Sequence, residues 1–510
     1  MNDVGNHMLN LPYILALIAT LGLTACASDK QTKPVEAAVS GLPGHAASDV
    51  AAREESAEDK KLDARLAALE ATIKAPTFET SPSQYQYRAL STAGVLAISR
   101  DKPKLGYTYL VRAVAMPDAD FDIRLAQTFT AGRLGYVADA VNGLTVMARQ
   151  WPDQLSSVEG GELFIVDVLD QAGKVPRSAR LTLLESLHDG RWTPKLGNAR
   201  TAIWRDLTML LLEAERRSEA IEVSLQVTDV YTLIAMRSDR RFDAVIAANP
   251  AHFDIDNAAD QELRGLQAAA DATPQSLELQ RRVVVALLSR QRYEAALAAA
   301  DSAFAAIKST NYPRKLYEDY EQRSSAFLDA RAVALERMGR WDEAVAELTI
   351  ASGGGNVNQL INLGSLYCEM GRPHEALSVI STVDARTSHY GTMQEESVRL
   401  DAAEQLGNSR DVERSLQYLR VHRADAPSAY LGALIVVSRL DKAAHELIAQ
   451  LTDVDQRQDA LQSVQEYGEV PGTAWDGELN ARWRKVVDRK DVQAVIHRVG
   501  RVESYHLELP

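Results

Sequence analysis

The chain is poor in cysteine, in aromatic residues and in positive charge, and each shortage argues against a class of protein. Its two cysteines, Cys26 and Cys368, lie in very different contexts within 510 residues, which argues against an internal disulfide. Aromatic residues contribute 6%, alternating β-branched runs are few and helix formers dominate, so we predict an all-α fold. A net charge of −14 disfavours a general nucleic-acid binder and broad adsorption to anionic lipid.

Catalytic signatures are missing as well. The ten histidines are scattered, and the sequence contains no His-Glu-x-x-His, Cys-x-x-Cys, Gly-x-Ser-x-Gly or Walker-type phosphate loop. We therefore expect no catalytic residue, no metal site and no cofactor, and predict that the protein is not an enzyme. The alternative is a periplasmic cell-wall enzyme of the helical lytic transglycosylase type. Glu185-Ser186 resembles the catalytic pair of that family, but the Gly-Leu-Met-Gln and Ala-Tyr-Asn blocks that should follow are absent.

Long apolar runs are absent too, and a short one near the start indicates a secretory signal. Residues Ile14–Leu23 form an apolar core of ten residues, which is too short for a membrane span. The ending Leu23-Thr24-Ala25-Cys26 resembles the lipobox of bacterial lipoproteins, although no Lys or Arg precedes it. The resemblance implies cleavage between Ala25 and Cys26 and a lipid on Cys26. An ordinary cleaved signal and an uncleaved anchor are the alternatives.

The segment after Cys26 has the composition of a flexible tether. Residues 27–61 are rich in Ala, Ser, Gly, Pro, Lys and Glu and show no apolar periodicity. Ala27 stands where the inner-membrane retention signal of enteric lipoproteins has Asp. The resemblance therefore implies an outer-membrane lipoprotein that faces the periplasm, and contact with the membrane through the N-terminal lipid.

What the sequence has in abundance is helix hairpins, and the clearest lies between residues 360 and 376. Small residues on each helix allow close approach, and a glycine separates the helices. The packing positions are Leu360, Leu363, Gly364, Tyr367, Gly371 and Ala376. This pattern resembles the tetratricopeptide repeat. Cys368, in the same helix, is expected to be a small semi-buried residue, with a reactive thiol as the alternative.

The pattern recurs at a spacing typical of stacked hairpins. The turn residues Gly339 and Gly371 lie 32 residues apart, and Gly407 follows 36 residues later, which brackets the tetratricopeptide period of about 34. The other residues assigned to repeat packing are Trp204, Leu207, Ala220, Tyr293, Ala296, Gly339, Trp341 and Ala344. We therefore predict an α-solenoid of tetratricopeptide-like repeats after a disordered N-terminal tether.

We divide the chain into five parts. They are a signal peptide at 1–25, the lipidated cysteine and linker at 26–61, degenerate helical repeats at 62–270, tetratricopeptide-like repeats at 271–470, and capping helices with a tail at 471–510. The tail after Val502 either pairs as a short strand or extends freely.

Two surfaces are candidates for binding. In tetratricopeptide arrays the first helices of successive hairpins line a concave groove, and the corresponding residues here are Arg281, Asp329, Glu336, Asn358, Ile361, Ser365 and Glu369. The second candidate is basic. Seven basic and two acidic residues lie between Arg482 and Arg501, including Arg482, Arg484, Lys485, Arg489 and Lys490. A solvated face beside acidic neighbours and a patch for an anionic polysaccharide or lipid phosphate both fit this composition.

These features predict a non-catalytic protein–protein interaction scaffold. It would be anchored by lipid to the bacterial outer membrane and would bind envelope proteins in its concave groove. Lipoproteins of this architecture support exopolysaccharide export or secretin and pilus assembly, and no motif separates the two.

Overall fold

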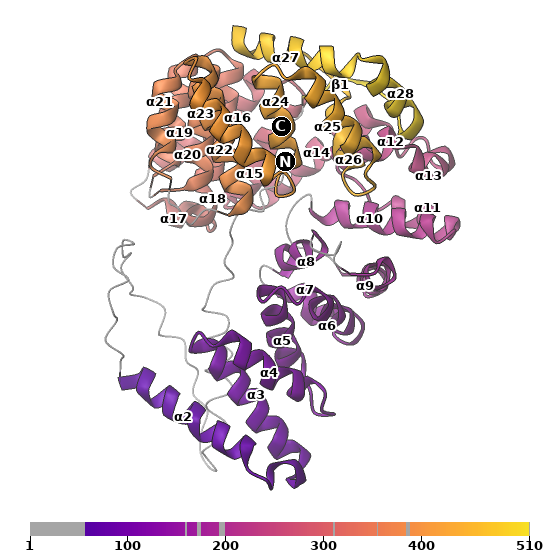
Figure 1. The fold of residues 1–510 in the computed structure, drawn as a ribbon, viewed down its shortest axis with the longest axis vertical. Coiled ribbons are helices and arrows are strands. Elements are labelled where there is room, and N and C mark those ends of the chain that lie inside the picture. The colour runs from indigo at the N-terminus through magenta and orange to yellow at the C-terminus, as the bar shows by residue number, and fades with distance from the viewer. Residues whose placement is uncertain are drawn as a thin grey trace. The chain divides into compact units, whose positions relative to one another are not determined.

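The computed structural model describes residues 57–158, 161–170, 175–192, 199–309, 312–353, 355–383 and 388–508. These residues fall into two compact units that divide between Arg200 and Thr201 (Figure 1). The predicted boundary at 270–271 therefore does not coincide with the division into units. The first described helix begins at Ala57, inside the predicted linker. Cys26, Ala25 and the predicted signal peptide lie outside the described residues.

The smaller unit is a stack of helices. In chain order its elements are α2 Ala57–Lys74, η1 Phe78–Thr80, α3 Ser83–Ser99, α4 Pro103–Val114, α5 Phe121–Arg133, α6 Val137–Gln150, α7 Pro152–Ser157, α8 Gly161–Asp170 and α9 Arg177–Asp189. Leu66, Leu90 and Leu110 are buried at the centre of its first hairpins. Helix α9 carries Glu185-Ser186, and Ser186 is buried, where its hydroxyl accepts a hydrogen bond from Arg149 at 2.9 Å.

The larger unit contains the clearest repeats. Its elements are α10 Ala199–Glu213, α11 Arg217–Ser224, α12 Val230–Ser238, η3 Arg240–Phe242, α13 Asp243–Ala248, α14 Ile255–Ala272, α15 Leu277–Ser289, α16 Tyr293–Lys308, α17 Pro313–Leu316, α18 Tyr320–Arg337, α19 Trp341–Ala351, α20 Val357–Glu369, α21 Pro373–Ile380, α22 His389–Gln405, α23 Ser409–Val421, α24 Pro427–Val436, α25 Leu440–Thr452, α26 Arg457–Ser463, β1 Glu466–Tyr467, α27 Ala474–Val487, α28 Lys490–Val499 and β2 Ser504–Tyr505. The all-α prediction is confirmed, and the only sheet in the described residues is the two-residue pair β1–β2. None of the described helices combines the length and apolar character needed to cross a bilayer.

Eight hairpin turns among the described residues share one backbone geometry. A residue with positive φ follows the first helix, and the next amide donates to the carbonyl five residues before it, at 2.8–2.9 Å. The positive-φ residues are Asp101, Gly135, Glu215, Gln291, Gly339, Gly371, Gly407 and Ser438. The turns predicted at Gly339, Gly371 and Gly407 are therefore confirmed.

The two glycines Gly371 and Gly432 should respond to alanine in opposite directions. At Gly371, with φ of +69°, alanine is expected to cost about 1–2 kcal/mol because its Cβ crowds the left-handed backbone. Gly432 lies in the interior of α24 with open space beside it, so alanine is expected to add about 0.5–1 kcal/mol. Urea denaturation of both variants measures the difference. A shift of the same sign in both would contradict the assigned turn geometry.

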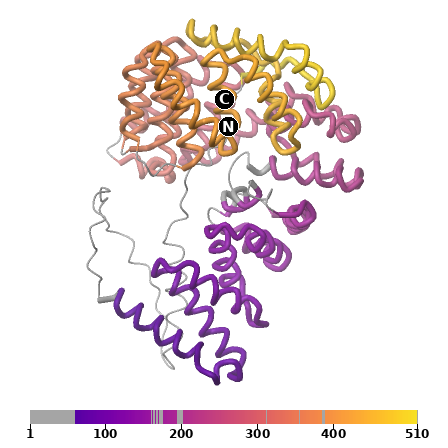
Figure 2. Tube along the Cα trace, viewed as in Figure 1, coloured from indigo at the N-terminus to yellow at the C-terminus, as the bar shows by residue number. Residues whose placement is uncertain are grey.

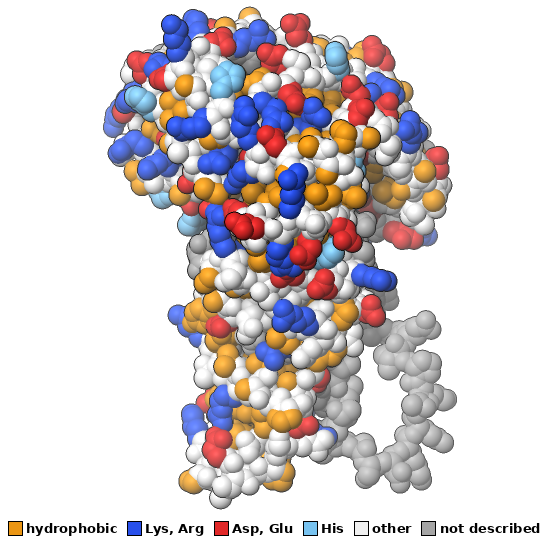
Figure 3. Space-filling model, turned by 90° about the vertical axis from the view of Figure 1, so that its right-hand side faces the viewer, with side chains coloured by type: hydrophobic (Ala, Val, Ile, Leu, Met, Phe, Trp, Pro, Cys, Tyr) orange, Lys and Arg blue, Asp and Glu red, His pale blue; other side chains and the backbone are white. Residues whose placement is uncertain are grey.

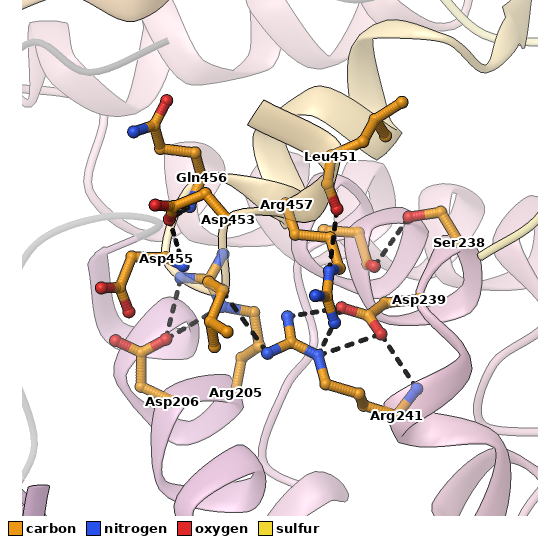
Figure 4. A network of polar contacts seen from close by, with 12 residues as sticks. Arg205, Asp206, Ser238, Asp239, Arg241, Leu451, Asp453, Asp455, Gln456 and Arg457 are labelled. Carbon is orange, nitrogen blue, oxygen red and sulfur yellow. Dashed lines mark hydrogen bonds and ion pairs between the residues drawn. The ribbon is translucent and has the colours of Figure 1, made fainter. Parts of the chain in front are cut away.

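The helices of the larger unit form a closed ring of packing contacts (Figures 1 and 2). Helix α12 packs on α14, the hairpins continue through α25, and α26 returns to pack on α12. At this junction Asp239, whose side chain is fully buried, pairs with Arg241 at 2.6 Å (Figure 4). Arg241 also donates to the carbonyl of Val454 at 3.5 Å, in the loop between α25 and α26. The side chain of Arg241 at one end of the ring is therefore bonded to the backbone of the other end.

The residues assigned to repeat packing occupy helix interfaces or turns. Trp204, Leu207, Ala220, Ala296, Ala344, Leu363 and Ala376 are buried, and Leu360, Tyr293, Trp341 and Tyr367 are partly buried. A Cβ on Gly364 would lie 3.0 Å from Ile380 and 3.1 Å from Val398, so this glycine permits close approach of the following helices. Cys368 is 1% exposed, and burial raises the pKa of its thiol, which agrees with the structural interpretation of this residue.

Candidate protein-binding surface

All seven predicted groove residues lie on first helices of successive hairpins, α15, α18 and α20. Asn362 on α20 donates to Asp329 on α18 at 2.9 Å, which links neighbouring first helices. Arg281 on α15 pairs with Glu278 at 2.7 Å. Asn358 is exposed and Ser365 is half-buried.

The groove prediction was wrong at Ile361 because this side chain is buried. Ile361 is 7% exposed and packs in a cluster with Cys368, Ile380 and Val398. It lies seven residues, or about two turns, before Cys368, so both side chains point toward the following hairpin rather than into a groove.

Glu336 and Glu369 lie at the C-terminal ends of α18 and α20. On this side of the ring, the ends of several helices contact the C-terminal part of the chain. We define the C-terminal module as residues 465–508, which contain β1, α27, α28 and β2. It contacts the C-terminal ends of five helices: α12, α15, α18, α22 and α24. Arg501 N donates to Ser238 O on α12, and Glu508 N donates to Ser289 O on α15. Arg337 on α18 donates to the Glu508 carboxylate. Trp475 Nε1 donates to Asp401 on α22, and Arg482 donates to the carbonyls of Ile435 and Val436 at the end of α24. The free carbonyls of helix ends need such donors.

The last part of the module, residues 501–508, contains strand β2 and a bend at His506, and we call it the C-terminal strand. Its side chains alternate: Ser504 and His506 are exposed, whereas Tyr505 and Leu507 are 8% and 1% exposed. Strand β2 pairs in parallel with β1, and Gly468 N donates to Leu507 O at 2.9 Å. The strand is therefore held like a bound peptide, by its backbone and by alternate side chains.

A buried carboxylate secures the end of this strand. Glu508 is 3% exposed and accepts hydrogen bonds from Arg337 at 2.6 Å and from the Tyr293 hydroxyl at 3.0 Å. Burial and the negative charge of Glu508 raise the pKa of Tyr293 to about 12, so Tyr293 remains a donor at neutral pH. Arg337 also pairs with Glu336. Such charge-assisted hydrogen bonds are stronger than neutral ones.

A second carboxylate is held five residues earlier. Arg237 on α12 donates to both oxygens of Glu503, at 2.7 and 3.0 Å, and the Tyr505 hydroxyl donates at 2.8 Å. Burial opposes ionisation of Glu503, but these hydrogen bonds bring its pKa below the ordinary value. The strand thus binds through two acidic anchors with apolar side chains between them.

We call the site around the C-terminal strand, formed by Arg237, Tyr293, Arg337 and Gln465, the recess. An acidic cluster surrounds its Arg337 end. Burial, followed by the charges of Glu336 and Asp476, raises the pKa of Glu369 to about 8. Burial also raises the pKa of Glu336 and of Asp401, whose carboxylate accepts from Trp475 at 3.1 Å. Within the residues that the structure covers, no group of three or more His, Cys, Asp or Glu could hold a metal ion.

The predicted basic patch is divided between structural and exposed residues. Arg482 pairs with Glu478 and lies 5.4 Å from the Trp475 ring, and Arg489 pairs with Asp491 and Asp441. Arg484, Lys485 and Lys490 are exposed. On the face of the larger unit that Figure 3 shows, basic side chains are mixed with acidic ones. The structure therefore places two members in ion pairs, and binding of an anionic polysaccharide stays a prediction.

The recess around the C-terminal strand was not identified from sequence. The alternation of Glu503, Tyr505 and Leu507 was the available signal, and it indicates a strand without indicating where that strand binds. Its partners Arg237 and Tyr293 lie more than two hundred residues away along the chain.

Comparisons with known proteins give structural matches with low TM-scores and no match to a family or a curated protein. Among solved structures, a Rap protein complexed with competence and sporulation factor has 13% identity and a TM-score of 0.32, covering 84% of this chain and 99% of that one. The Cut9-Hcn1 hetero-tetramer of APC/C has 10% identity and a TM-score of 0.29, covering 86% and 93%. The P58(IPK) TPR domain has 13% identity and a TM-score of 0.17, covering 86% and 94%.

These scores are too low to carry an argument, and the fold assignment rests on the hairpins of this chain. Helix pairs with left-handed turn residues recur through the larger unit, and the turns at Gly339, Gly371, Gly407 and Ser438 follow one another at a period near 34 residues. The fold is an α-solenoid of tetratricopeptide type.

Proposed function

We propose that this protein is a non-catalytic scaffold that binds extended segments of partner proteins on its ring of helix hairpins. One observation supports this function most directly: the helix ends of the ring hold an extended strand through both its backbone and its side chains. A partner segment that replaced this strand would form the same kinds of backbone and side-chain hydrogen bonds. Farther along the first helices, toward their N-terminal ends, Asn358 is exposed on α20 and offers further contact area.

The membrane anchor is part of this proposal. A lipid on Cys26 and the linker after it would hold the scaffold at the outer membrane, facing the periplasm. We predict that cells supplied with a palmitate analogue label the wild-type chain and do not label a Cys26→Ser variant. The measurement is in-gel fluorescence of the purified chain. Equal labelling of both chains, or none of the wild type, would contradict lipidation.

The partner is proposed to belong to an envelope system for exopolysaccharide export or for secretin or pilus assembly. The test is photo-crosslinking in the native envelope from Asn358, with a matched probe at Ile350 on α19 as the control. Both positions are exposed, but only Asn358 is on a first helix. A β-barrel or secretin enriched from Asn358 supports assembly, and polysaccharide synthase components support export. Equal adducts from both probes would contradict binding through the first helices.

A further inference from the structure

We propose that the recess holding the C-terminal strand is a binding site for an extended acidic segment of a partner protein, with the chain's own strand as a competing occupant. The recognised pattern is Glu-x-Tyr-x-Leu-Glu, as the chain has it at residues 503–508. This inference rests on the proposed scaffold function and specifies one class of partner segment.

The recess selects this pattern by charge and by shape. Arg237 holds the first carboxylate through two nitrogens, and Arg337 with Tyr293 holds the second. The side chains of Tyr505 and Leu507 are buried between these two anchors. Alternate residues of an extended chain share one face, which places Glu503, Tyr505 and Leu507 together. Glu508 follows the bend at His506 and reaches Arg337 and Tyr293.

The residues that line the recess keep other partners when the strand leaves. Arg237 also donates to the carbonyl of Phe253 at 2.9 Å, and Arg337 also pairs with Glu336. Gln465, which accepts from Glu503 N at 2.8 Å, donates to the carbonyl of Leu461 at 2.7 Å. The site is therefore oriented by the ring and by α26, and a preorganised site loses less entropy on binding.

The occupant is attached in a way that permits exchange. Only two residues of the strand form the ladder with β1. The strand follows the end of α28 at Val499 and Gly500, whose backbone is extended. Its release breaks the β1–β2 pair and leaves the packing contacts among the ring helices in place. A segment in the same polypeptide has a high effective concentration, and a partner must therefore match or exceed its contacts.

The test uses the full chain and a fluorescein-labelled synthetic peptide with the sequence of residues 499–508. In wild type the strand competes with the peptide. A Leu507→Ser, Glu508→Gln double variant weakens the occupant and leaves the recess intact. Fluorescence anisotropy is expected to show about tenfold tighter binding to the double variant than to wild type. A further Arg237→Gln substitution, or a peptide with Gln at both glutamates, is expected to lose that gain.

Hydrogen exchange on the wild-type chain provides a second measurement that needs no variant. Excess unlabelled peptide is expected to accelerate exchange of the amides at residues 503–508, because displaced amides lose bonds such as Glu508 N to Ser289 O. Unchanged exchange, or equal binding of the acidic and the Gln peptides, would overturn the proposal. The proposal would also be overturned if the double variant formed dimers that the peptide does not dissociate. That result would indicate that the recess binds a second copy of this chain. Crosslinking from Asn358 is independent of these outcomes, so it separates failure of this site from failure of the scaffold function.

Discussion

Replacing Arg337 by methionine is expected to lower the free energy of unfolding by about 3–5 kcal/mol at pH 8. Arg337 lies between two carboxylates that are themselves largely buried, Glu336 and Glu508, with 15% and 4% of their side chains exposed. Removing the guanidinium leaves both negative charges with little solvent. Methionine has a similar length and no charge, so the effect of lost packing is kept small. Urea denaturation measures the loss.

Two further variants separate the electrostatic cause from damage to packing. Adding Glu508→Gln to Arg337→Met removes one of the two buried negative charges that have lost their arginine. The double variant is therefore expected to be more stable than Arg337→Met alone. Arg340→Met removes the same charge from an exposed pair, Arg340 with Glu343, and is expected to lose much less stability. A loss below about 1 kcal/mol for Arg337→Met would mean that the strand does not depend on this ion pair.

The positions of several hairpins could be predicted because their turns contain glycine. At Gly339, Gly371 and Gly407 the backbone is left-handed, and glycine adopts that conformation without steric cost. Glu215 and Ser438 adopt the same geometry without glycine, so their turns carry no comparable signal in the sequence. There the stacking of neighbouring helices determines the turn.

Closure of the ring and the position of the C-terminal strand could not be predicted. Each hairpin adds a small rotation to the next, and one sequence does not report the sum of these rotations. The consequence is visible at Glu336 and Glu369, which local periodicity assigned to an open groove. Both carboxyls are instead close enough to Asp476, in a module that begins about one hundred residues later, for its charge to raise their pKa values. At Ile361 the error was local, because one helix has both a groove side and a packing side.

Replacing Glu369 by glutamine is expected to stabilise the protein increasingly as pH rises from about 5 to 8. In the folded chain burial, Glu336 and Asp476 raise the pKa of Glu369 to about 8, whereas an unfolded glutamate titrates near 4.5. Between these values the folded state retains a proton that the unfolded state releases, so rising pH favours unfolding. The stability linked to this carboxyl is fully present below pH 4.5 and is lost as pH approaches 8.

Glutamine keeps the shape and a neutral amide, and it does not titrate. The difference in unfolding free energy between Glu369→Gln and wild type is therefore expected to be small near pH 5 and to reach about 3–4 kcal/mol at pH 8. Glu318→Gln, at an exposed position between α17 and α18, removes the same formal charge and serves as the control. Glu336 and Asp401 are present in both chains, so the difference between variant and wild type reports Glu369 together with its coupling to Glu336. A difference that is constant with pH would show that this carboxylate is ionised in the folded ring, and that the C-terminal module leaves it solvated.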